Sequence, residues 1–162
     1  VYVAHQLFAT LDPTLRRIEL PHAGGAVVAD TVGFISDLPH DLIEAFSATL
    51  EETRDADLLL HVIDAHHHDV KAQISQVEQV LEEIGAVEIP ILQVFNKIDL
   101  LPASEAKIER DGHNKPKRIW LSAAQNLGLD LLKQAMAELL YGEPIRRQII
   151  LTPQEGQLRA QL

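Results

Sequence analysis

The sequence contains no cysteine, which excludes a disulfide framework and any metal site built on thiolates. It has no apolar run long enough to span a bilayer as a helix, and no charged-then-apolar leader of the kind that marks export. We therefore expect a cytoplasmic protein without a membrane span. The length of 162 residues suits one compact domain with a continuous core.

Basic residues are outnumbered: 14 Lys and Arg against 24 Asp and Glu give a formal net charge of -10 at pH 7. Such a chain repels the phosphates of nucleic acids at long range. We expect no DNA partner. Any contact with RNA must come from a local basic spot, such as Lys115, Lys117 and Arg118, or from a region outside the chain.

Short apolar runs alternate with helical patterns along the chain. Buried strands are predicted at 26–29, 58–63, 91–95 and 119–121, and a looser, edge-like strand at 15–20. Apolar residues spaced by three or four predict helices at 42–50, 70–84 and 132–139. Continuous apolar strands are what a parallel sheet covered on both faces requires, so we predict a three-layer α/β fold.

A D-x-x-G sequence follows the first of the predicted buried strands. Asp30 stands at the strand end, and Gly33 comes where a backbone would have to approach a phosphate closely. Ligands of open α/β sheets bind beyond the carboxyl ends of the strands, which makes this a candidate site. Taken alone, the motif is more simply a strand-ending turn.

An N-K-x-D box, Asn96 to Asp99, follows the strand predicted at 91–95. Guanine presents two neighbouring donors on one edge, and the carboxylate of Asp99 can accept both, whereas adenine has an acceptor and no amino group there. Lys97 can lay its aliphatic stem along the purine face, and Asn96 can tie neighbouring loops together. The alternative is a solvated polar turn.

The triplet Ser122, Ala123, Ala124 follows the last predicted strand. Small residues let a backbone N–H reach the carbonyl oxygen of guanine, although the triplet means little by itself. The three boxes stand in order, each at the end of a strand in an alternating α/β pattern. Together they indicate a guanine-nucleotide domain.

The segments at 6–17 and 30–42 are more specific than these boxes. With F-A-T-L-D-P-T at 8–14 and L-P-H-D-L at 38–42, the chain resembles the HflX family of ribosome-associated GTPases, in the Obg and HflX branch of the translation-factor GTPases. The resemblance covers essentially the whole chain. It implies a P-loop NTPase-like G domain that binds GTP and GDP with Mg²⁺ and hydrolyses GTP. It also implies the ribosome, through its 50S subunit, as partner, and a role in ribosome splitting or rescue.

The resemblance also implies residue roles. Thr10 would bind Mg²⁺, with Thr14 as its rival, while Asp30 would hold the ion through a water and the Gly33 N–H would sense the terminal phosphate. Phe34 stands where signalling GTPases place a water-orienting glutamine, so we expect slow intrinsic hydrolysis and assign no certain catalytic residue. The candidate GTP-binding residues are Phe8, Ala9, Thr10, Leu11, Asp12, Asp30, Thr31, Val32, Gly33, Asn96, Lys97, Ile98, Asp99, Ser122, Ala123 and Ala124.

The phosphate-gripping motif G-x-x-x-x-G-K-[ST] does not occur, because none of the 8 glycines precedes a lysine. The resemblance places this P-loop, with its strand and helix, just before Val1. We expect residues 1–146 to form a partial G domain, residues 147–162 to begin a connector or a C-terminal domain, and the chain alone to be inactive. The alternative is a degenerate GTPase-like domain that serves as a protein or RNA interaction module.

Histidines in and after the strand predicted at 58–63 suggest other chemistry. His66, His67 and His68, with Asp64 and Asp69 nearby, raise a zinc hypothesis, but consecutive side chains diverge, and a solvated loop is the better interpretation. His61 and Trp120 are expected in the core.

Overall fold

The computed structural model describes residues 14–30, 53–102 and 104–142. Its elements are β1 (Thr14–Leu20), β2 (Gly24–Asp30), β3 (Leu59–Asp64), α3 (Val70–Glu83), β4 (Ile91–Asn96), the 3-10 helix η1 (Ile98–Leu100), β5 (Lys107–Arg110), β6 (Pro116–Trp120) and α4 (Leu129–Tyr141). The helix predicted at 42–50 lies outside the described residues. No helix in the described ranges is both long and apolar enough to cross a membrane.

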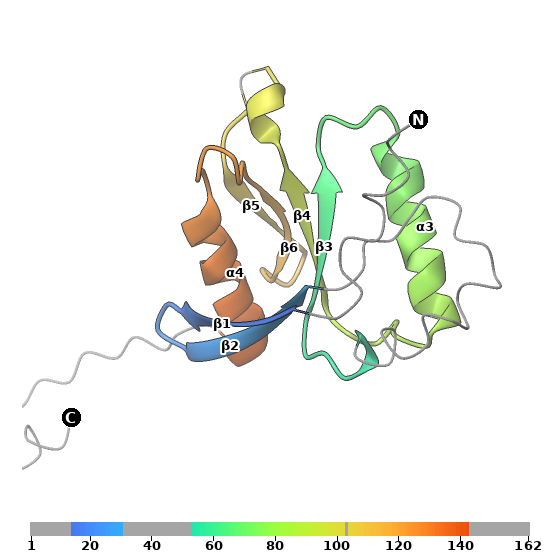
Figure 1. Ribbon diagram of the computed structural model, residues 1–162, viewed down its shortest axis with the longest axis vertical. Coiled ribbons are helices and arrows are strands. Elements are labelled where there is room, and N and C mark those ends of the chain that lie inside the picture. Colours follow the sequence, from blue (N-terminus) through green and yellow to red (C-terminus); the bar gives the residue numbers. More distant parts are fainter. Residues whose placement is uncertain (1–13, 31–52, 103, 143–162) are drawn as a thin grey trace, which may run out of the picture.

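The central sheet has the strand order β3-β4-β6-β5. Strands β3, β4 and β6 run parallel, and β5 is antiparallel to β6. Helix α4 covers one face of this sheet and α3 the other (Figure 1). The predicted three-layer α/β fold is confirmed.

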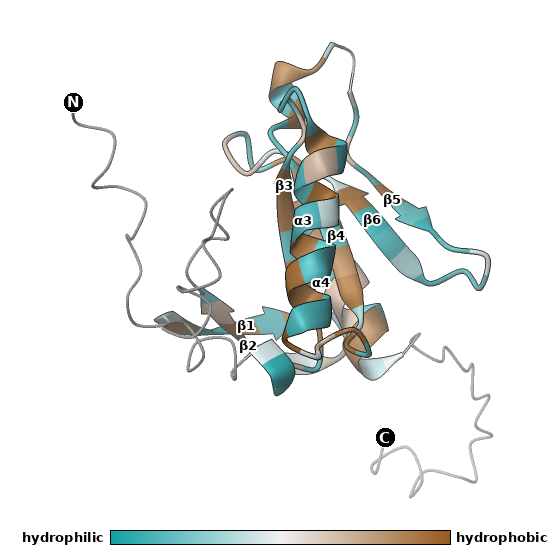
Figure 2. Cartoon of the chain, turned by 90° about the vertical axis from the view of Figure 1, so that its right-hand side faces the viewer, coloured by the Kyte–Doolittle hydropathy of each residue, from teal (hydrophilic) through white to brown (hydrophobic). Residues whose placement is uncertain are grey.

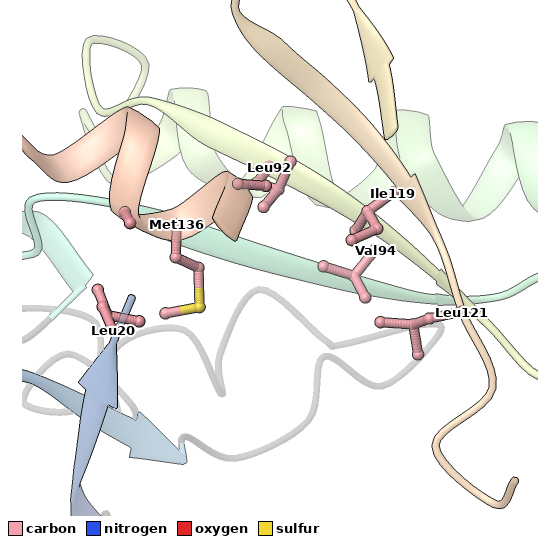
Figure 3. Close-up of a cluster of buried hydrophobic side chains, with 8 residues drawn as sticks. Leu20, Leu92, Val94, Ile119, Leu121 and Met136 are labelled. Atoms are coloured by element: carbon pink, nitrogen blue, oxygen red, sulfur yellow. The ribbon is translucent and has the colours of Figure 1, made fainter. Parts of the chain in front are cut away.

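The core divides between the two faces according to the alternation of side chains along each strand. On the α4 face, Leu92 and Val94 of β4 pack with Ile119, Leu121 and Met136 (Figure 3). On the α3 face, a smaller buried cluster comes from α3 and the turn after it; its members are Leu81, Ile84 and Ala86. Figure 2 shows the hydrophobic character of β3 and β4 and the hydrophilic character of β5 at the sheet edge. Of the strands in this sheet, β4 therefore fits best the prediction of burial on both faces.

Both helices have an identifiable start signal. Helix α3 begins after Asp69, whose Oδ1 accepts a hydrogen bond from the Ala72 N–H (3.2 Å), as an N-cap should. Helix α4 begins after Gly128, which has a φ of 80° and packs so tightly that an added Cβ would lie 2.8 Å from the Ala106 Cβ. Only glycine fits that position, and it fixes where α4 leaves the loop after β6.

The sequence predicts that residues 26–29 form a buried strand of the parallel sheet, and this is wrong both in the neighbouring strand and in the burial. Strand β2 pairs antiparallel with β1, and the two form a separate two-stranded sheet. The hairpin packs on α4 through the buried Leu20, and the Tyr141 hydroxyl donates a hydrogen bond to the Gly25 carbonyl (2.8 Å). Only one face of the hairpin is packed in this way, so Leu15 and Val27 on its strands stay exposed.

Candidate functional site

The carboxyl ends of β3, β4 and β6 meet at one edge of the sheet because these strands are parallel. Asp64 is the last residue of β3 and lies opposite Asn96, the last residue of β4. The η1 turn and the loop at 121–128 follow β4 and β6 at the same edge (Figure 1). The N-K-x-D box and the Ser-Ala-Ala triplet are therefore brought together at this edge.

Asn96 joins the two loops. Its Oδ1 accepts one hydrogen bond from the Lys97 N–H (2.8 Å) and another from the Ala123 N–H (3.0 Å). The backbone of Lys97 is left-handed, with a φ of 66°, so the chain turns sharply into η1. Ile98, which is fully buried, anchors that turn through a hydrogen bond from its N–H to the Leu121 carbonyl (3.2 Å). The loop-tying role expected for Asn96 is present in the structure.

Asp99 is held from the other loop by Ser122. The Ser122 Oγ donates a hydrogen bond to Asp99 Oδ1 (2.5 Å) and accepts one from the Gln125 N–H (3.2 Å). Ser122 is completely buried, whereas Asp99 is exposed. The carboxylate is thus fixed by a buried neighbour and still open to a ligand, which is the arrangement a base-reading acceptor needs.

An ion pair crosses from β3 to the lysine of the box. Lys97 Nζ lies 2.6 Å from Asp64 Oδ2, and the His66 N–H donates to Asp64 Oδ1 (2.9 Å). The hydrogen bond from Lys97 is the main cause that lowers the pKa of Asp64 below its ordinary value. Sequence reasoning considered Asp64 only as a zinc ligand. The signal that could have identified its role is its position at a strand end adjacent to that of Asn96.

The structure does not bring Asp30 to this edge. The β1–β2 hairpin lies beside the last turns of α4, at the end of the sheet opposite η1 (Figure 1). Within the hairpin, Asp30 lies opposite Thr14. A carboxylate and a hydroxyl residue therefore form the last pair of the hairpin, at the end away from its turn. The other candidates near the N-terminus lie outside the described residues; they are Phe8, Ala9, Thr10, Leu11, Asp12, Thr31, Val32, Gly33 and Phe34.

The histidine-rich turn makes local contacts. His67 Nδ1 accepts a hydrogen bond from the Asp69 N–H (3.1 Å), and the rings of His67 and His68 lie 4.3 Å apart. Within the described ranges, no three His, Cys, Asp or Glu side chains are placed to hold a metal ion. His61 is half-buried on β3, and this burial lowers its pKa, which favours the neutral ring. Trp120 stacks on the buried Phe95 with a centroid distance of 4.4 Å.

The donors proposed for Mg²⁺ can be judged by their chemistry. Mg²⁺ takes oxygen ligands, keeps several waters and is often held by one or two protein groups together with the phosphates of a nucleotide. The carboxylate of Asp30, exposed at the end of β2, fits a contact through water, and a threonine hydroxyl fits a direct one. These residue types are therefore compatible with the ion.

Comparison with known proteins gives consistent matches. The model of a family described as "50S ribosome-binding GTPase" matches residues 1–97. GTPase HflX of Escherichia coli (strain K12) is 58% identical over 160 residues, which are 99% of this chain and 38% of that protein. GTPase HflX of Caldanaerobacter subterraneus subsp. tengcongensis is 49% identical over 142 residues, 88% of this chain and 32% of that protein. The chain thus spans about a third of the length of these relatives, and its resemblance to HflX is confirmed.

Solved structures give the same fold. A crystal structure of SsGBP in complex with GDP matches with a TM-score of 0.64 and 27% identity, over 84% of this chain and 45% of that one. A crystal structure of Era with MgGDPNP and a segment of 16S ribosomal RNA matches with a TM-score of 0.59 over 85% of this chain and 48% of that one. At 20% identity, the likeness to Era concerns the fold alone.

Proposed function

Because the chain belongs to the family of 50S ribosome-binding GTPases, we propose that it supplies the base-recognising part of a GTPase that acts at the large ribosomal subunit. The observation that carries this proposal is the pairing of two loops at one sheet edge. Asn96 binds the Ala123 N–H, and Asp99 is held by Ser122. In the proposed site the base contacts both loops, so bonds that fix their separation favour its recognition.

In the proposed site, Asp99 reads the base. Its carboxylate accepts from the ring N–H and the exocyclic amino group of guanine, and adenine cannot supply that pair of donors. The small side chains of Ala123 and Ala124 are exposed beside it and leave room for the base. The stem of Lys97 covers one face of the ring, while its ammonium, partly exposed, pairs with Asp64.

Phosphate and metal binding rest on the residues nearer the N-terminus. We assign the Mg²⁺ contacts to Thr10, with Thr14 as the rival, and to Asp30 through a water. Because the β1–β2 hairpin lies at the end of the sheet opposite η1 in this structure, the Asp30 contact requires the hairpin to shift toward the base-reading loops when nucleotide binds. When bound, the ion neutralises charge that develops on the phosphates during transfer. Gly33 contributes a backbone N–H to the terminal phosphate, and Phe34 leaves the attacking water without a side-chain partner at that position.

The ribosome is the proposed site of action. The basic spot noted in the sequence spans the end of the β5–β6 turn and the start of β6, where Lys115 and Lys117 are exposed. Such cations can contact RNA phosphates locally even on a chain with a net charge of -10. Contact with the 50S subunit in ribosome splitting or rescue is the role that we propose, which would place the protein in the cytoplasm.

A chimaera tests the proposal. In it, residues 1–162 replace the aligned segment of GTPase HflX from E. coli, which supplies the rest of a full-length relative. We expect the chimaera to bind GTP at least about tenfold more tightly than ATP, since a mispaired polar edge costs about 1–3 kcal/mol. We also expect its GTP hydrolysis to rise when 50S subunits are added. Equal binding of GTP and ATP would contradict the proposed function and favour an interaction module.

The chain alone serves as the comparison. Residues 1–162 contain no P-loop motif, which supplies most charge-assisted contacts to a triphosphate. Calorimetry should therefore find much weaker GTP binding to the isolated chain than to the chimaera. Submicromolar affinity of the isolated chain for GTP would contradict this account of its phosphate binding.

A further inference from the structure

The ion pair between Asp64 and Lys97 lies within the candidate site, yet Asp64 belongs to none of the three boxes. It joins the end of β3 to the residue after β4, across 33 positions of the sequence. Its Nζ–Oδ2 distance of 2.6 Å is that of a direct charge-assisted hydrogen bond. The ammonium of the base-covering lysine therefore has a specific partner on the neighbouring strand.

The carboxylate of Asp64 is itself fixed before it meets the lysine. One oxygen, Oδ1, accepts from the His66 N–H (2.9 Å), which leaves Oδ2 directed to Lys97. The backbone directly after β3 is also held to the end of β4, because the Ala65 N–H donates a hydrogen bond to the Asn96 carbonyl (2.9 Å). Asp64 thus has a defined orientation that does not depend on the lysine.

Lys97 needs such a partner because its side chain is flexible. A lysine side chain has a four-carbon stem, and ordering it against a base costs rotamer freedom. Its backbone is already set by the left-handed turn and by the bond from its N–H to Asn96 Oδ1 (2.8 Å). The bond to Asp64 fixes the other end of the stem. With both ends held, the methylene groups between them are restrained before a ligand arrives.

We propose that Asp64 is a positioning residue of the nucleotide site, whose carboxylate holds the Lys97 ammonium so that the lysine stem is preorganised to cover the face of a guanine base. The inference rests on the proposed function, because it needs a base in contact with Lys97. Asp64 itself touches no part of the base. Its effect should concern nucleotide affinity and leave untouched both the choice between bases and the rate of the chemical step.

The expected effect is modest because the pair is partly open to solvent. The side chains of Lys97 and Asp64 are 52% and 33% exposed. Ion pairs of this exposure contribute little free energy, and salt screens the attraction between their charges. Asp64→Ala should therefore weaken GDP and GTP binding about two- to fivefold at low salt, and the difference should shrink at about 1 M salt, where the Debye length is about 3 Å.

A double-mutant cycle in the chimaera tests the inference. Lys97→Met keeps an apolar stem and removes the ammonium, so Asp64→Ala should cause no further loss of GDP affinity in that background. The matched control is Glu109→Ala, which breaks the Lys107–Glu109 pair (2.8 Å; side chains 56% and 35% exposed) at the sheet edge and should leave affinity unchanged. The rate of hydrolysis at saturating GTP and the preference for GTP over XTP should be the same in Asp64→Ala and the unmutated chimaera.

Each result decides the matter. An equal loss of affinity from Asp64→Ala with lysine or methionine at position 97 would overturn the positioning role, because the effect would then not pass through the ammonium. No loss, or a gain, with lysine present would overturn it as well. If the unmutated chimaera does not prefer GTP to ATP, the proposed function fails and the inference fails with it. If that preference holds and only the cycle shows no coupling, the inference alone is wrong.

Discussion

Ser122, completely buried in the loop after β6, donates its hydroxyl hydrogen to Asp99 in the loop after β4, with an Oγ–Oδ1 distance of 2.5 Å. The two residues are 23 positions apart, and the bond orients the carboxylate that is proposed to read the base. A carboxylate with a fixed orientation can meet two donors at once without first losing rotamer freedom. The geometry of Asp99 is thus set by a residue that need not touch the ligand.

The first prediction concerns this bond. Ser122→Ala in the chimaera should weaken GTP binding by about tenfold, because a hydrogen bond to a charged group contributes about 1.5–3 kcal/mol and solvent replaces part of it. Equilibrium competition between GTP and a fluorescent GDP measures the change. Ser75→Ala on the exposed surface of α3 is the control and should have no effect. An affinity unchanged by Ser122→Ala would show that Asp99 is oriented without the serine.

The second prediction concerns acid stability. Arg110 Nη1 lies 2.7 Å from Glu138 Oε2, and this pair, with the Glu138 side chain only 9% exposed, ties β5 to α4. Arg110 is the main cause that lowers the pKa of Glu138, with a smaller contribution from Gln134. Since the folded pKa lies below the unfolded one, the stabilisation is complete above about pH 4.3 and is lost as the pH falls through the folded pKa.

Glu138→Gln removes this linkage. The protection factors of amides in β5 and α4, which correct exchange rates for their intrinsic pH dependence, should be lower in the variant at pH 7 and should fall less on acidification than in the unmutated chimaera. Glu83→Gln, on the exposed face of α3, should change neither quantity. If protection of β5 and α4 in the variant falls as steeply with pH as in the unmutated protein, Glu138 does not carry the acid sensitivity.

The third prediction concerns Phe34, which lies outside the described residues and is argued from the sequence. Phe34→Gln in the chimaera should not by itself produce fast hydrolysis, because a glutamine orients water only when its neighbours orient the glutamine. Single-turnover hydrolysis without ribosomes measures this. An acceleration of about a hundredfold, equal to about 2.7 kcal/mol of barrier, would contradict the view that catalysis is organised differently here.

Much of the sheet could be predicted from the sequence because local apolar runs coincide with strands. Strand β4 was predicted at 91–95 and spans Ile91–Asn96, and the helical stripe at 70–84 became α3 at Val70–Glu83. Strand β6 begins earlier than predicted, at Pro116, and ends before Leu121. Strand β5 was missed because its four residues, Lys-Ile-Glu-Arg, carry a single apolar side chain at an exposed sheet edge.

What the sequence could not supply is partner choice between distant elements. Residues 24–30 have the same strand pattern whether they pair with a parallel neighbour or with β1, and only the packing of Leu20 and Gly25 against α4 distinguishes the two. Asp64 shows the same limit at the site. Its pairing with Lys97 depends on β3 and β4 being neighbours in register, which no local motif specifies.

The central claim is that the Asn96–Asp99 box reads guanine, and one substitution tests it. Asp99→Asn replaces an acceptor with a donor, so guanine meets a mismatched group and GTP affinity should fall at least about tenfold. Xanthine carries a carbonyl where guanine has its amino group, and that carbonyl accepts from the new amide. The variant should therefore gain affinity for XTP.

Competition binding of GTP and XTP to the Asp99→Asn chimaera is the most direct measurement. The account predicts a reversal, in which the unmutated chimaera prefers GTP and the variant prefers XTP. Asp130→Asn, an exposed carboxylate in the first turn of α4, is the control and should keep the preference for GTP. An Asp99→Asn variant with the same order of preference as the unmutated protein would contradict the account, and the box would then be no more than a polar turn.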